Sequence, residues 1–225
     1  MGNFIDLTAK DGHTFGAYEA KPQGKPRGGL VVIQEIFGVN AHIRWVADGY
    51  AADGYHVLAP AMFDRAERNV ELGYDKDGID RGRALRGAIS TDMMLLDIAA
   101  TLDALKGAGK VGLVGYCMGG SFAWLSAARV PGFAATIGYY GGTVAENLGE
   151  QPKCPVMLHF GDKDGSIPLA DAEKVKATLE PKDVPVFIYE GAGHAFNRFG
   201  NQAWHEPSAK LARERSLKFL RDNVG

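Results

Sequence analysis

Short, mostly apolar runs alternate with longer amphipathic segments along most of this chain. Such runs are typical of strands buried on both faces of a parallel sheet, and they lie at residues 30–33, 56–59, 111–114, 134–139, 156–160 and 186–189. Segments with apolar residues at helical spacing predict helices at residues 44–52, 93–105, 121–128, 169–179 and 208–222. The alternation predicts an α/β fold with a mostly parallel sheet and helices on both faces.

Two segments depart from this alternation. Residues 4–7 and 14–19 alternate between apolar and polar positions around the Asp11-Gly12 turn, which predicts an antiparallel hairpin. Residues 63–88 are rich in Asp, Arg and Gly and have the least regular pattern, so we expect an insertion or a mobile segment over one sheet edge. No break in composition divides the chain, and a single domain over residues 1–225 is therefore expected.

Composition and charge narrow the possible functions. The 225 residues include 25 Lys and Arg against 27 Asp and Glu, a formal net charge of −2. A nucleic-acid-binding protein usually carries a basic surplus, so that function is not expected. No apolar run reaches the ~18 residues of a membrane-spanning helix. Two cysteines, Cys117 and Cys154, are too few for a disulfide framework, so we expect a cytoplasmic protein.

The strongest chemical motif follows the strand predicted at 111–114. In parallel sheets of this kind, ligands bind beyond the carboxyl ends of the strands. The run Gly115-Tyr116-Cys117-Met118-Gly119 is the G-x-S-x-G turn of hydrolases with cysteine in place of serine. The helix that follows favours a thiolate at its N-terminus and offers the Met118 N–H to an oxyanion. The alternative, a buried structural cysteine, explains neither the flanking glycines nor the strand and helix on either side.

Two later strands also end in candidate catalytic residues. Asp162 and Asp164 both follow the strand at 156–160. Asp162 resembles a loop-forming carboxylate, whereas Asp164 lies further beyond the strand and is the preferred acid; an Asx turn would explain either one alone. His194 follows the strand at 186–189 and is flanked by small residues, so it is free to reach across the sheet end. A capping or surface histidine is the alternative.

The chain order of Cys117, Asp164 and His194 is that of the α/β-hydrolase triad. Papain-like peptidases place their histidine before the third residue, so they fit this chain badly. We expect His194 to share or take the thiol proton and Asp164 to fix the tautomer of His194. The pattern predicts a nucleophilic hydrolase whose thiolate is largely pre-formed.

A fourth polar group follows the strand at 30–33. Glu35 would face the same crevice as Cys117, and the Ile36 N–H is placed to be the second oxyanion donor. The alternative for Glu35 is an ion pair with a nearby Lys or Arg at the rim of the crevice.

These motifs resemble those of the dienelactone hydrolase family, also called carboxymethylenebutenolidases. The resemblance covers nearly the whole chain and is carried by residues 11–16, 34–40, 111–120, 139–140 and 192–194. It implies an α/β-hydrolase fold without a large cap domain and a catalytic triad of Cys117, Asp164 and His194. It also implies that Glu35 contacts the thiol and helps control its ionisation when substrate binds. The backbone N–H groups of Ile36 and Met118 would be the oxyanion donors.

The same resemblance implies an anionic substrate. The family's substrate is a lactone that bears a carboxylate, formed during the breakdown of chlorinated aromatic compounds. Arg198 matches a family arginine that binds this carboxylate, although a surface arginine is the alternative. A second arginine is expected from the irregular stretch, with Arg81 the candidate and Arg83 and Arg86 its rivals. By position, the aromatic residues that could line the pocket are Phe37, Tyr139 and Phe196, although packing in the core is the alternative for each of them.

One departure from the family pattern keeps other functions open. The known enzymes line their pocket with a tryptophan from the irregular stretch, but this chain has none between Trp45 and Trp124. A general carboxylesterase or thioesterase of the same fold is therefore an alternative. A non-catalytic module that binds a ligand, or senses oxidants through Cys117, is another.

No cofactor is expected, because the sequence contains no nucleotide-binding glycine motif and no histidine pair at metal-ligand spacing. The expected partner is a small ester or lactone, with no nucleic acid and no membrane. The chain would act as a monomer or a small homo-oligomer.

Overall fold

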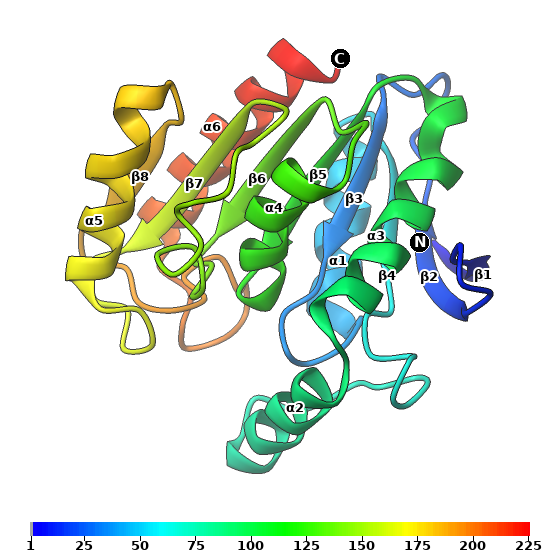
Figure 1. Cartoon of the computed structure of the whole chain (residues 1–225), viewed down its shortest axis with the longest axis horizontal. Helices are drawn as coiled ribbons and strands as arrows, with labels where there is room; N and C mark the ends of the chain where they lie inside the picture. Colours follow the sequence, from blue (N-terminus) through cyan, green and yellow to red (C-terminus); the bar gives the residue numbers. More distant parts are fainter. Residues whose placement is uncertain (1) are drawn as a thin grey trace.

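The computed structural model describes residues 2–225, and its strands form one eight-stranded sheet in the order β1-β2-β4-β3-β5-β6-β7-β8 (Figure 1). The strands are β1 (Asn3–Thr8), β2 (Thr14–Ala20), β3 (Gly29–Ile33), β4 (His56–Pro60), β5 (Val111–Tyr116), β6 (Ala135–Tyr139), β7 (Val156–Gly161) and β8 (Val186–Tyr189). β1 and β2 form the predicted hairpin, and β2 pairs antiparallel with β4. All pairings from β4 to β8 are parallel, which confirms the predicted α/β class.

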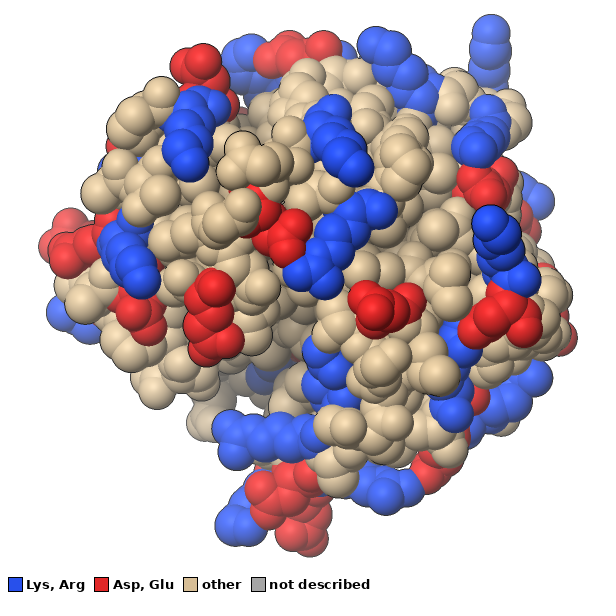
Figure 2. All heavy atoms as spheres, viewed as in Figure 1, with Lys and Arg blue, Asp and Glu red and all other residues tan. Residues whose placement is uncertain are grey.

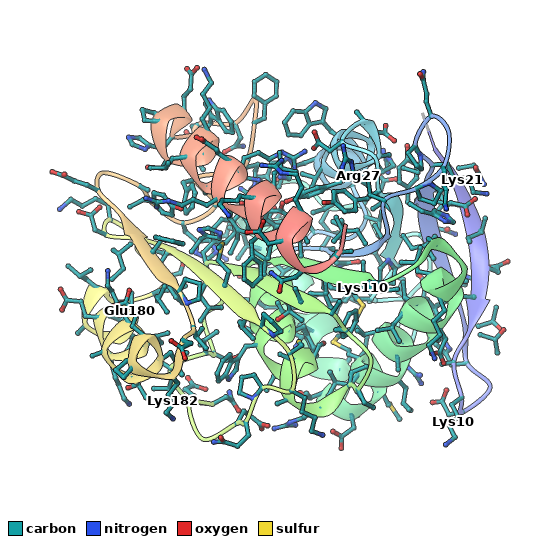
Figure 3. The ribbon with its side chains drawn as sticks, turned by 90° about the horizontal axis from the view of Figure 1, so that it is seen from above. Lys10, Lys21, Arg27, Lys110, Glu180 and Lys182 are labelled. Atoms are coloured by element: carbon teal, nitrogen blue, oxygen red, sulfur yellow. The ribbon has the colours of Figure 1, made fainter. Side chains whose placement is uncertain are left out.

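Helices cover both faces of the sheet (Figure 1). They are α1 (Ala41–Ala52), α2 (Lys76–Ala88), α3 (Thr91–Leu105), α4 (Met118–Arg129), α5 (Leu169–Leu179) and α6 (Glu206–Asn223). Seen from above, α6 and α1 lie on one side of the sheet and α3, α4 and α5 on the other (Figure 3). Every residue of β3 and β5 is buried between these two layers, which explains why both strands are uninterrupted apolar runs.

Several helices begin a few residues before their apolar pattern does, because polar residues cap them. The Asn40 side chain accepts a hydrogen bond from the Ile43 N–H at the start of α1. Ser90 caps α3 in the same way, by accepting from the Met93 N–H. These caps satisfy backbone donors that the first turn leaves without partners. The spacing of hydrophobic residues does not reveal these capping residues.

The helix α2 corrects the expectation of an irregular segment at 63–88. Asp75 caps this helix by accepting from the Gly78 N–H at 2.8 Å, and α2 projects from the main body at the carboxyl-end side of the sheet (Figure 1). Its buried residues are Gly78, Gly82 and Leu85. Two of these three have no side chain, and apolar residues are scarce in this helix, so the sequence pattern missed it.

The surface offers no large area of one charge on the face shown in Figure 2, where acidic and basic side chains are intermixed. This distribution agrees with the small net charge of −2. Within residues 2–225, no helix has the length and apolar character needed to cross a bilayer.

Candidate active site

Cys117 occupies a strained turn between β5 and α4. Its φ of 55° lies in the left-handed region, which is costly for a residue with a side chain and is found where the surrounding structure enforces it. The flanking glycines make the turn possible. A Cβ at Gly115 would lie 1.9 Å from the Gly119 carbonyl oxygen, and one at Gly119 would lie 2.4 Å from that of Ile33. The G-x-C-x-G spacing is thus required by close backbone approach as well as by the turn itself.

The structure brings Cys117, His194 and Asp164 into one hydrogen-bonded chain. His194 Nε2 lies 3.2 Å from Cys117 Sγ, and His194 Nδ1 lies 2.8 Å from Asp164 Oδ2. The other oxygen of Asp164 accepts from the N–H groups of Ser166 and Ile167, at 2.7 and 3.0 Å. Asp162 instead accepts from the Gly191 N–H at 2.7 Å and thereby joins two loops. Of the two aspartates, Asp164 therefore contacts His194, and Asp162 does not.

The environment of His194 favours its charged form. Burial alone would lower the pKa of His194, but hydrogen bonds to Asp164 and Cys117 outweigh this effect and raise the pKa to about 10. The ring of the buried Tyr140 lies 5.1 Å from that of His194 and packs beside it. These contacts favour a protonated His194 between the Asp164 carboxylate and the Cys117 sulfur.

Glu35 and Arg198 form a buried ion pair next to this chain of residues. Their exposed fractions are 1% and 8%. Arg198 Nε and Nη2 donate to the two oxygens of Glu35 at 3.1 and 2.9 Å. Burial opposes the charge on Arg198, but the carboxylate of Glu35 outweighs this effect, so the pKa of Arg198 is raised. The Arg198 guanidinium also lies over the rings of Tyr74 and Phe37, at 4.0 and 5.2 Å from their centroids.

This pairing differs from the contact that the family resemblance implies for Glu35. Among the hydrogen bonds of residues 2–225, the Glu35 carboxylate accepts from Arg198, and no bond to Cys117 is formed. The alternative considered for Glu35, an ion pair with a basic neighbour, is the arrangement in this structure. Because Arg198 holds both carboxylate oxygens, Glu35 would have to leave that partner to reach the thiol.

A cavity of about 440 Å³ opens above Cys117, between α2, α4 and the carboxyl ends of the strands. Most of its lining is apolar, and its basic residues are His194 and three arginines. The lining residues are Ile36, Phe37, Tyr74, Ile79, Arg83, Arg86, Cys117, Met118, Ser121, Phe122, Leu125, Gly142, Thr143, Ser166, Ile167, His194, Ala195 and Arg198. The described residues in this lining include three arginines and no acidic side chain.

Ile36 and Met118 both line the cavity on either side of Cys117. Their two segments are joined by a hydrogen bond from the Gly119 N–H to the Gln34 carbonyl, at 3.2 Å. Within residues 2–225, neither the Ile36 nor the Met118 N–H takes part in the backbone hydrogen bonds of turns and caps. Two backbone donors are thus available to an oxygen atom placed above the sulfur.

The arginine expected at position 81 lies outside the cavity. Arg81 is exposed and forms an ion pair with Glu67, whereas Arg83 and Arg86 line the cavity from the same helix. Residues three apart share a helix face and residues two apart do not, so Arg83 and Arg86 point together while Arg81 points elsewhere. Without a predicted helix at this position, the sequence could not distinguish the three.

Tyr139 and Phe196, two of the aromatic residues expected at the pocket, do not line the cavity, whereas Phe37 does. The side chains of Tyr139 and Phe196 are instead fully buried in the core of the domain. Successive side chains of a strand point to opposite faces. Tyr139 points toward α6, where its hydroxyl lies 2.7 Å from Ser216 Oγ.

Sequence reasoning also missed several apolar residues of the cavity wall. Phe122 and Leu125 lie three residues apart on the helix that follows Cys117, a spacing that could have identified them. No such signal marks Tyr74, Ile79 or Ile167, which come from other segments. Within residues 2–225, no three His, Cys, Asp or Glu side chains gather in a metal-binding cluster.

Comparison with known proteins places this geometry in a family. The chain matches the family model of the dienelactone hydrolases over residues 15–224. It is 33% identical over 225 residues to the carboxymethylenebutenolidase of Pseudomonas putida, which covers 96% of this chain and 94% of that protein.

Solved structures agree. A Klebsiella pneumoniae protein provisionally assigned as a dienelactone hydrolase superposes with a TM-score of 0.83 at 27% identity, over 96% of this chain and 98% of that one. The fold is also shared, at 20% identity and a TM-score of 0.77, by a dienelactone hydrolase-like promiscuous phosphotriesterase from metagenomic libraries, over 100% of this chain and 99% of that one. The chain therefore belongs to the dienelactone hydrolase family and is a carboxylic ester hydrolase that acts on esters or lactones.

Proposed function

We propose that this enzyme hydrolyses an activated ester or lactone that bears a carboxylate, through a thioester on Cys117. The observation that carries the proposal is the continuous contact from Cys117 Sγ through His194 to Asp164 at the floor of the cavity. A thiolate and imidazolium pair in this position is ready for attack without prior proton transfer.

The proposed reaction has two halves. Cys117 Sγ attacks the substrate carbonyl carbon, and the oxygen that becomes negative accepts hydrogen bonds from the Ile36 and Met118 N–H groups. The carbon–oxygen bond to the leaving group then breaks, with His194 supplying the proton that the departing oxygen takes up. Water next attacks the thioester, His194 accepts its proton, and the carboxylic acid leaves as the Cys117–His194 pair is restored. An enolate leaves easily and an amine does not, so peptides should be poor substrates.

Three arginines in a cavity lining without acidic side chains support an anionic substrate. A carboxylate could bind Arg198 with both oxygens, as Glu35 does. It would then compete with Glu35 for the guanidinium and release that carboxylate beside Cys117. This exchange would bring the Glu35 carboxylate next to the Cys117 sulfur, the contact that the family resemblance implies for Glu35.

Arg86 and Arg83 are proposed as a second anchor for negative charge. The Arg86 guanidinium donates to the Ile89 carbonyl and to Thr91 Oγ1, both at 3.0 Å, and lies 5.3 Å from the centroid of the Phe122 ring. All three partners are neutral, and burial lowers the pKa of Arg86. A substrate carboxylate would supply the missing counter-charge.

Trapping the acyl-enzyme tests the nucleophile directly. The protein is mixed with 4-nitrophenyl acetate, quenched in acid and digested, and the acetylated peptide is identified by mass spectrometry. We expect acetylation of Cys117 and, in Cys117→Ala, a loss of turnover of at least about 10⁴-fold. Cys154→Ala is the matched control and should keep wild-type activity, because Cys154 is outside the cavity. Retained turnover in Cys117→Ala would rule out the thioester mechanism.

A substrate panel tests the anionic preference. The wild-type enzyme is assayed with cis- and trans-dienelactone, with 4-nitrophenyl monoesters of dicarboxylic acids, and with neutral 4-nitrophenyl esters of the same chain length. A higher kcat/KM for the anionic member of each pair is expected. Equal values would favour the second candidate, a general carboxylesterase, which the largely apolar cavity walls would also accommodate.

A further inference from the structure

Gly82 brings α2 into direct contact with the segment that carries a proposed oxyanion donor. A Cβ at Gly82 would lie 2.0 Å from the Ile36 carbonyl oxygen and 3.1 Å from its carbonyl carbon. Gly82 is helical and does not have a positive φ, so its backbone conformation suits any residue. Only the close approach of the two backbones requires glycine here.

The same stretch of chain contacts the Ile36 segment at a second place. The Leu72 N–H donates to the Phe37 carbonyl at 2.9 Å, and Gly38 and Glu71 form an isolated β-bridge. Gly38 has a φ of +81°, and a Cβ there would lie 1.8 Å from the Val70 carbonyl oxygen. Residues 70–72 and α2 therefore contact residues 36–38 through backbone atoms. Backbone atoms cannot move aside by a change of rotamer, as a side chain can.

Contacts on the inner side hold the preceding residues. The side-chain oxygen of Gln34 accepts from the Met62 N–H at 3.1 Å, and Arg198 holds Glu35 with two hydrogen bonds. Ile36 thus lies between a fixed strand end and the backbone of α2. Its position relative to Met118 depends on where α2 packs.

We propose that Gly82 is a positioning residue for the oxyanion site: it allows α2 to pack against Ile36 and so fixes the Ile36 N–H beside that of Met118. This inference rests on the proposed thioester mechanism, in which those two groups stabilise the negative oxygen. One short helix then has two roles, because it carries Arg83 and Arg86 and also sets the geometry for attack. Oxyanion donors must be held in place before the reaction to be effective.

Two glycine-to-alanine variants of α2 form a matched test. Gly82→Ala places a methyl group against the Ile36 carbonyl, whereas Gly87→Ala places the same group in open space, with no atom within 4 Å. Both changes raise the helix propensity of α2 alike, so a general effect on the helix appears in both.

Two reactions of Cys117 are measured in each variant. Acetylation by 4-nitrophenyl acetate passes through an oxyanion, whereas alkylation by iodoacetamide displaces iodide and needs none. The acetate ester is neutral and small, so displaced arginines would not slow its reaction. Gly82→Ala is expected to slow acetylation about 10- to 100-fold and to leave alkylation within about twofold, whereas Gly87→Ala leaves both rates unchanged.

Three outcomes would overturn the inference. In the first, the acetylation rates of Gly82→Ala and Gly87→Ala are equal. In the second, acetylation and alkylation slow by the same factor in Gly82→Ala, which would mean that the substitution disturbs Cys117 or His194. If the wild-type thiol is alkylated but never acetylated, the thioester mechanism fails and this inference fails with it. Only that third outcome involves the wild-type protein, so the two failures are distinguishable.

A second variant covers the case in which Gly82→Ala does not fold. Leu85 is the buried side chain that anchors α2, with 4% exposed. Leu85→Ala loosens the helix without placing an atom against Ile36. The ratio of acetylation to alkylation rates should fall about threefold, which is less than in Gly82→Ala. The thermal midpoint is recorded to show that the protein is folded. An unchanged ratio in folded Leu85→Ala would contradict the proposal.

Discussion

The floor and the roof of the cavity are built in different ways. The floor consists of strand ends and the turns that follow them, and every residue of β5 and β7 is buried. The roof is α2, which buries one leucine and two glycines. The floor is thus fixed by the core of the domain, whereas the roof depends on a few backbone contacts. The reactive groups lie on the rigid part, whereas Arg83 and Arg86, proposed for selectivity, lie on the part that is easier to vary.

The sharpest test of the floor compares its two aspartates. Asp164→Asn keeps the size of the side chain but removes the charge that orients His194, so kcat should fall by about 10³- to 10⁴-fold. Asp162→Asn changes a carboxylate that accepts from the Gly191 N–H. This change should lower kcat less than about tenfold, because it weakens one hydrogen bond between two loops. Steady-state kinetics with 4-nitrophenyl acetate measure both. A loss in Asp164→Asn as small as that expected for Asp162→Asn would show that Asp164 does not orient His194.

Arg198 connects the floor to the substrate. Arg198→Met leaves the Glu35 carboxylate buried without its partner, which should lower the free energy of unfolding by about 3 kcal/mol. Urea denaturation measures this loss, and the double variant Glu35→Gln, Arg198→Met should recover part of it. Both variants should lose the preference for anionic over neutral esters. A double variant that is no more stable than the single one would mean that the buried ion pair is not the origin of the loss.

The roof is tested by its arginines. Arg86→Met should lower kcat/KM for anionic esters about tenfold relative to neutral esters of equal length, since one charge-assisted hydrogen bond is lost. Arg83→Met should act in the same direction and more weakly, because Arg83 is exposed to solvent. Arg81→Met is the control from the same helix, and its ratio of anionic to neutral kcat/KM should equal that of the wild type.

The pH dependence of stability tests the charge state of His194 at the floor. The folded state raises the pKa of His194 from 6.5 to about 10, so between these values the folded protein binds more protons than the unfolded chain. The stabilising contribution is complete below about pH 6.5 and is lost as the pH rises toward about 10. The free energy of unfolding should therefore fall from pH 7 to pH 9.5 more steeply in the wild type than in His194→Gln. Parallel curves would contradict the proposed charge state.

The amino-acid sequence determined the floor because local rules govern it. Short uninterrupted apolar runs are typical of strands covered on both faces, and the G-x-C-x-G spacing between a predicted strand and a predicted helix indicates a sharp turn. The carboxyl ends of parallel strands meet at one edge, so residues as distant as Cys117 and His194 were expected to converge there. Their separation of 3.2 Å in the structure agrees with that expectation.

Only the tertiary structure decided the partners of the polar and aromatic side chains. Glu35 and Arg198 are 163 residues apart, and no local pattern shows that they pair with each other. The direction of Tyr139 depends on which face of β6 the helix α6 covers. The helix α2 has few apolar residues, and its position depends on the contact of glycine backbones with residues 36 and 73. That position decides that Arg83 and Arg86, and not Arg81, line the cavity. Hydrophobic patterns predict which side chains are buried, but they do not predict where two backbones pack directly against each other.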